Sequence, residues 1–232
     1  MTLEIEFIPV SKDAQLLVPA PKPAKNYIPQ WYKDIQIENK PQFDNSGDIT
    51  NENVKHCVPF LDALTQGYIQ ESWTDIYIEF DGKALGYHFP VKPAIMGHRN
   101  KKNIPLIENI FYDTEFVWNE QWIPKLPKGY SALYTSPLNY FTLPFRSLDA
   151  VIDSDNYYHE YTGQYPFYIY KGFVGLIPAG TPLYQIIPIK RDDWKSKNLL
   201  YNEEQNKINN HKLRKHYFRS YKTLFWQKKR FD

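Results

Sequence analysis

Cysteine, methionine and glycine are scarce in this chain. Its 232 residues include one cysteine (Cys57), two methionines and 10 glycines. A single cysteine excludes an internal disulfide framework and a zinc site that needs several thiolates. No apolar run approaches the roughly 18 residues of a membrane-spanning helix, and the N-terminal sequence MTLEIEFIPV lacks the long apolar stretch of a signal peptide. We therefore expect no membrane span and no secretion through a signal peptide.

The common catalytic motifs are also missing. The sequence contains no phosphate-binding P-loop, no GxGxxG, no GxSxG and no HExxH. Iron-dependent oxygenases on a jelly roll commonly carry a His-x-Asp or His-x-Glu pair, and none of the six histidines is followed by such a carboxylate. A site could still assemble in space from His88, His98, His159 and Asp153. A metal-dependent jelly-roll oxygenase is therefore kept as a minor alternative, with no metal ligand assigned.

Aromatic residues, in contrast, make up 17% of the chain, and prolines outnumber glycines by 18 to 10. This composition favours strands and ordered loops over helices. Alternating apolar residues predict strands at Leu3–Pro9, Trp73–Phe80 and Ile107–Trp118. The dipeptide Asp81-Gly82 predicts a hairpin that continues into a strand at 84–89. Many short strands between turn signals predict a mainly-β single domain of the β-clip, jelly-roll or sandwich-like type.

Two segments flank this core, which we place at residues 42–191. Residues 1–41 hold the first strand and then a series of prolines. We predict that residues 18–41 form an extended arm without regular structure, anchored by Trp31 and Tyr32. Residues 192–232 are predicted to form a basic C-terminal α-helical segment.

Two helices are predicted from local signals. Pro59–Gly67 has a proline suited to the first turn and a glycine suited to the position after the last turn. Glu203–Gln227 has no proline or glycine, and its apolar residues recur every three or four positions. This spacing predicts one amphipathic helix with a basic outer face.

Charge is unevenly distributed along the chain. The sequence from Lys190 onward has 13 Lys/Arg and 5 Asp/Glu, a net charge of +8, whereas residues 1–189 have 15 and 21, a net charge of −6. We expect the basic segment to dock on the acidic body or on a neighbouring subunit. Its basic and aromatic residues also suit nucleic acid, and there we expect only weak association at low salt.

The most informative stretch is 126–191. The apolar run 150–152 ends in two carboxylates, Asp153 and Asp155. An aromatic-rich strand is predicted at Tyr165–Val174, followed by a turn at Gly180 and another strand at Leu183–Ile189. Both faces of that last strand are apolar apart from Gln185, so we expect a buried glutamine that needs hydrogen-bond partners.

This stretch resembles the β-clip family of trimeric dUTPases and dCTP deaminases. Val151-Ile152-Asp153-Ser154-Asp155 is similar to the family's catalytic turn, Gly180 to Gln185 to a nearby strand, and 127–139 to a Pro-Gly segment. The resemblance implies Asp153 and Asp155 as catalytic residues with Mg²⁺. It also implies ligand contacts by Tyr130, Ser131 and Gln185. The family's Arg-Ser-Gly phosphate contact and C-terminal glycine-rich loop are missing. We therefore predict no turnover of dUTP or dCTP.

Most of the chain also resembles uncharacterised phage and bacterial proteins. The shared features are a Trp-Tyr-Lys at 31–33, Cys57, Asp62-Ala63 and the segment Gly175 to Pro188. This resemblance carries no biochemical role with it. From the whole sequence we predict a non-catalytic assembly or binding protein of phage type, oligomeric through its N-terminal arm and its C-terminal helix. Its partners would be itself or other subunits, and its location the host cytoplasm or the virion. A divergent dUTPase-like nucleotide-binding or nucleotide-processing protein is the alternative.

Overall fold

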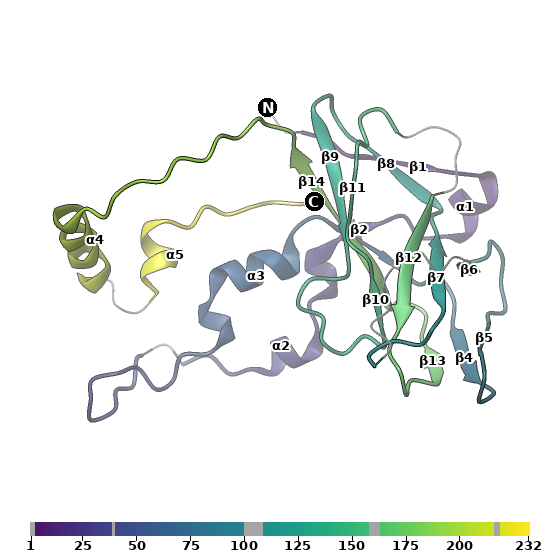
Figure 1. The fold of residues 1–232 in the computed structure, drawn as a ribbon, viewed down its shortest axis with the longest axis horizontal. Coiled ribbons are helices and arrows are strands. Elements are labelled where there is room, and N and C mark those ends of the chain that lie inside the picture. Colours follow the sequence, from purple (N-terminus) through teal and green to yellow (C-terminus); the bar gives the residue numbers. More distant parts are fainter. Residues whose placement is uncertain (1–2, 39, 100–108, 158–162, 216–218) are drawn as a thin grey trace.

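The computed structural model describes residues 3–38, 40–99, 109–157, 163–215 and 219–232 (Figure 1). The body is mainly β, as predicted, and its paired strands are antiparallel. The largest sheet has five strands in the order β11 (Ala150–Ile152), β9 (Tyr130–Thr135), β14 (Pro182–Lys190), β3 (Tyr68–Glu71) and β2 (Lys22–Pro23). The second sheet has four, in the order β10 (Phe145–Ser147), β12 (Gln164–Ile169), β7 (Glu115–Asn119) and β6 (Met96–Arg99).

Two smaller sheets complete the body. The three-stranded sheet has the order β13 (Gly175–Ile177), β4 (Ile76–Phe80) and β5 (Leu85–His88), and the two-stranded sheet pairs β1 (Glu6–Pro9) with β8 (Trp122–Lys125). The predicted hairpin at Asp81-Gly82 is confirmed as the β4–β5 connection. The aromatic strand is shorter than predicted: it ends at Ile169, and Gly172 follows at φ +86° in a turn.

One apolar core joins the sheets. Trp118 of β7 stacks on Phe167 of β12 with ring centroids 3.6 Å apart, and Tyr184 of β14 meets Tyr165 of β12 at 5.1 Å. Two polar side chains inside this core are paired, because Trp118 Nε1 donates to Ser147 Oγ at 2.9 Å and Ser147 Oγ donates to the Leu183 carbonyl at 2.7 Å. The buried Tyr165 hydroxyl has no hydrogen-bond partner among the described residues. Burial of these rings supplies much of the drive for folding.

The N-terminal segment differs from the predicted arm. It contains α1 (Lys12–Leu17), the 3₁₀-helix η1 (Ala24–Tyr27) and α2 (Gln30–Asp34), so the prediction of no regular structure over 18–41 is wrong. The prolines are compatible with these helices because Pro23 and Pro29 occupy the N-cap positions, where no intrahelical N–H is needed. Tyr32 is buried, as an anchor should be. The segment packs on its own body, since Ala14, Val18 and Ala24 are also buried.

Helix α3 (Val58–Thr65) confirms the predicted short helix, with proline in its first turn. Gly67 follows at φ +69°. A Cβ at Gly67 would lie 2.2 Å from the carbonyl oxygen of Ile186, so glycine is required both by the backbone angle and by the closeness of β14. This glycine fixes how α3 meets the five-stranded sheet.

The C-terminal segment leaves the body at the end of β14 and later returns to it. Figure 1 shows a long extended stretch that reaches α4 (Glu203–Lys215), then α5 (Ser220–Leu224) and a final stretch that comes back beside β2. The predicted C-terminal helix is confirmed at 203–215, and 220–224 forms a separate short helix instead of one helix that continues to 227. Arg219 has φ +67°, which ends any helical path before α5. Among the described residues, no helix is long and apolar enough to span a membrane.

Candidate functional site

Four of the five residues predicted as site residues lie together, around Arg191. Ser131 Oγ donates to Asp153 Oδ1 at 2.7 Å, and Arg191 Nη1 lies 3.1 Å from the same oxygen. Arg191 also pairs with Asp155, and its Nη1 donates to the Tyr130 carbonyl at 3.0 Å. The group joins the end of β14 to the start of β9 and to the turn after β11.

These contacts are those of a turn anchor. The Gly129 N–H donates to Asp155 Oδ2 at 2.8 Å, and Arg191 with this N–H holds the pKa of the Asp155 carboxyl below its usual range. A general base at neutral pH benefits from the opposite shift, towards 7. The pair does not fit Mg²⁺ either, because Arg191 already places a fixed positive charge against both carboxylates.

Gln185 lies apart from this cluster. It pairs with Thr135 across β9 and β14, whereas Ser131 pairs with Ile189, four residues further along. Its amide is fully used, as predicted for a buried glutamine: Oε1 accepts from the Leu138 N–H at 2.8 Å, and Nε2 donates to the carbonyls of Ala63 and Gln66. Gln185 therefore connects the sheet to α3 and to the loop after β9.

Two of the three histidines considered for a metal site are described, and each has an aromatic neighbour. His88 stacks on Tyr77, while His98 lies on β6 near the Tyr87 hydroxyl. His159 lies outside the described residues. Within the described ranges there is no group of three or more His, Cys, Asp or Glu side chains that could hold a metal ion.

A buried carboxyl, which sequence analysis did not select, lies between the two large sheets. Glu120 is 4% exposed and accepts a hydrogen bond from the Tyr134 hydroxyl. Burial raises the pKa of Glu120 to about 7. The rings of Tyr165 and Tyr184 pack against Tyr134, so the carboxyl lies beside an aromatic cluster. The sequence gives no signal for it, because Glu120 is one polar residue in the run Asn119-Glu120-Gln121.

A concave surface lies where the C-terminal stretch returns to the body. Two hollows of about 440 Å³ and about 360 Å³ share Leu61 and Trp226, and we call the combined surface the tail groove. Its body side is α3 with Lys25, Tyr32 and Lys55, and its other side is formed from residues 219–232. Seven cationic side chains line it: Lys25, Lys55, Arg219, Lys222, Lys228, Lys229 and Arg230.

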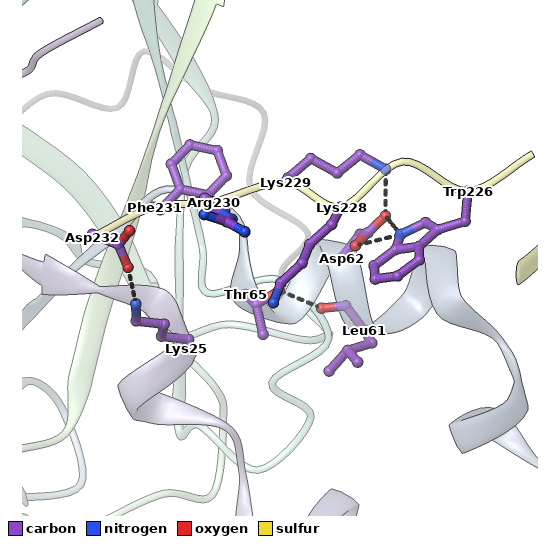
Figure 2. Close-up of a pocket in the computed structure, with 10 residues that line it drawn as sticks. All are labelled: Lys25, Leu61, Asp62, Thr65, Trp226, Lys228, Lys229, Arg230, Phe231 and Asp232. Carbon is purple, nitrogen blue, oxygen red and sulfur yellow. Dashed lines mark hydrogen bonds and ion pairs between the residues drawn. The ribbon is translucent and has the colours of Figure 1, made fainter. Parts of the chain in front are cut away.

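Specific contacts hold the tail in place (Figure 2). Trp226 Nε1 donates to Asp62 Oδ2 at 3.0 Å, and Lys229 Nζ lies 2.6 Å from the same oxygen. Lys25 forms an ion pair with Asp232, and Phe231 packs edge-on against Tyr68. Docking of the basic segment on the body is therefore observed within one chain, through Asp62 of the body and Asp232 of the segment itself.

No protein-family model, no curated protein and no solved structure matches this chain. The function is therefore inferred from the geometry of the chain itself.

Proposed function

We propose that this protein is a non-catalytic assembly subunit of phage type that joins other copies of itself through its C-terminal excursion. The part that makes the contact is residues 192–215, which we call the arm from here on. It is distinct from the N-terminal arm predicted at 18–41. It follows Arg191, which ion pairs tie to Asp153 and Asp155 of the body, and it precedes the docked tail. Asp153 and Asp155 would anchor the start of this arm, because they hold Arg191 next to it.

One observation carries the proposal. The arm exposes large apolar side chains to a degree that a single chain does not explain: Trp194 is 86% exposed, Leu199 79%, Leu200 96% and Tyr201 77%. These four residues lie within eight positions, and we call them the arm's apolar patch. Large apolar side chains exposed close together mark interaction sites. Covering a leucine side chain of this size is worth about 2 kcal/mol.

Charge favours a second copy as the partner. The body up to residue 189 has a net charge of −6, and the chain from Lys190 onward has +8. Each copy therefore offers an acidic surface and a basic segment, so contact between unlike parts of two copies is attractive. The 11 extended residues 192–202, at about 3.3 Å each, can span roughly 35 Å, which is far enough to reach another copy.

The test is the mass of the full-length protein in solution. We expect light scattering to show an oligomer whose mass falls to that of one chain in L199D/L200D, because two buried charges cannot be accommodated in an apolar contact. The matched control is L16D/L17D, which changes two adjacent exposed leucines of α1, 69% and 58% exposed. A monomer at all concentrations, or equal loss in both variants, would contradict the proposal.

A further inference from the structure

We propose that the tail groove binds single-stranded nucleic acid, with its cations on the phosphates and its aromatic rings against the bases. This inference goes beyond assembly and rests on different residues from those of the arm's apolar patch.

Charge is the first support. Seven cationic side chains line the groove, and the carboxylates among its described lining residues are Asp62 and Asp232. Lys25 and Lys229 are neutralised by these two. Within the described part of the chain, Lys222, Lys228 and Arg230 have no ion pair. Like charges held close together repel one another, so entry of a polyanion relieves this repulsion.

The aromatic rings are the second support. Trp226 belongs to both hollows, and its N–H bond to Asp62 fixes the ring between them. Phe231 lines the larger hollow. Tyr32 lines the smaller one, but its ring is buried against Phe60 and lies under the Lys55 ammonium at 5.6 Å, so Trp226 and Phe231 are the rings that can receive bases. Figure 2 shows the cationic groups of Lys228 and Arg230 between the Trp226–Asp62 contact and the Lys25–Asp232 pair.

Cations interleaved with rings match the alternation of phosphate and base along a single strand. In a duplex the bases are already paired and stacked, so the rings would have no exposed base faces to bind. An acidic peptide would neutralise the cations but leave the rings without a stacking partner. A single strand is therefore the ligand that uses both features of the groove.

This inference differs from the weak association expected from the sequence, because the sequence shows only the basic C-terminal segment. The structure adds Lys25 and Lys55 from the body to the same concave surface. It also sets Trp226 between the two hollows.

The experiment is fluorescence anisotropy of a labelled 20-nucleotide oligothymidylate with the full-length protein. If the strand neutralises the groove through about four phosphates, a threefold rise in NaCl should weaken binding about 20-fold. K228A/R230A should weaken binding at least tenfold at fixed salt. The matched control, K83A/K171A, removes two exposed cations elsewhere on the body and should bind as the parent does.

Three further results decide between explanations. A duplex of the same length and a polyglutamate peptide should both compete poorly, and equal competition by either would overturn the assignment to a single strand. Equal weakening in K83A/K171A and K228A/R230A would show diffuse attraction and also overturn it. L199D/L200D should retain binding even as a monomer. Loss of nucleic-acid binding in L199D/L200D would contradict the inference that the groove is complete within one chain. The mass of that variant tests assembly and does not bear on the groove.

Discussion

At the scale of single residues, buried polar groups show how closely the core is specified. Gln185 and Glu120 are each nearly inaccessible to solvent, yet they differ in kind. Gln185 is neutral, and both ends of its amide are hydrogen-bonded. Glu120 is ionisable, and burial raises its pKa to about 7. For each residue we predict how a substitution changes the free energy of unfolding.

Q185M should destabilise the protein by about 2–4 kcal/mol, because it leaves the Leu138 N–H and the carbonyls of Ala63 and Gln66 without this partner. Methionine is similar in length, so loss of volume adds little. The exposed Gln15 provides the control, since Q15M should change the free energy of unfolding by less than about 0.5 kcal/mol. Urea denaturation of both variants measures the difference, and equal stabilities would contradict the assigned role of Gln185.

Glu120 predicts a pH dependence. Because its pKa rises from 4.5 to about 7 on folding, the folded state keeps a proton that the unfolded state releases between those values. Its contribution to stability is therefore fully present below pH 4.5, and is lost as the pH rises through 7. E120Q removes this loss, so its stability relative to the parent should increase by about 3 kcal/mol from pH 4.5 to pH 8. A difference that does not change with pH would show that Glu120 does not titrate as described.

At the scale of elements, the close contact between Gly67, after α3, and β14 predicts a large loss of stability when a side chain is added. G67A should cost about 4 kcal/mol, because its Cβ would collide with the backbone at Ile186. Gly82 is the control: it has a similarly positive φ, +92°, but a Cβ there meets nothing within 4 Å. G82A should therefore cost only the backbone strain, about 1–2 kcal/mol. Equal costs would mean that the close approach to β14 is unimportant.

Elements with local signals could be predicted, and those set by distant contacts could not. Pro59, Gly67 and the Asp81-Gly82 turn each act on their immediate neighbours, so α3 and the β4–β5 hairpin follow from the sequence. The N-terminal helices could not be predicted, because the sequence does not distinguish a proline at an N-cap from a proline in a coil. The positive φ at Arg219 could not be predicted either, because the residue that adopts it is not a glycine.

The candidate site divides in the same way. Asp153 and Asp155 stand out in the sequence, but whether they act or anchor depends on Arg191, which is more than 30 residues away. The tail groove could not be predicted at all, since Lys25 and Lys229 come from opposite ends of the chain and meet only after folding.

At the scale of the whole molecule, charge and apolar exposure are separated between the parts of the chain. The body is acidic, the residues after it are basic, and the largest exposed apolar side chains gather in the arm. We propose that the arm of one copy lies on the body of another, where both its charge and its apolar side chains would be matched. The central claim of our account is that this contact forms between copies.

Carbodiimide cross-linking of an equal mixture of ¹⁴N-labelled and ¹⁵N-labelled protein tests this claim most directly. Lys195 and Lys197 lie beside the exposed apolar residues of the arm, and an amine joins a carboxylate only when the two are in contact. We predict cross-links of mixed isotopes between these lysines and carboxylates of residues 3–189, and we predict their disappearance in L199D/L200D. Cross-links confined to peptides of one isotope would place the arm on its own chain and contradict the account.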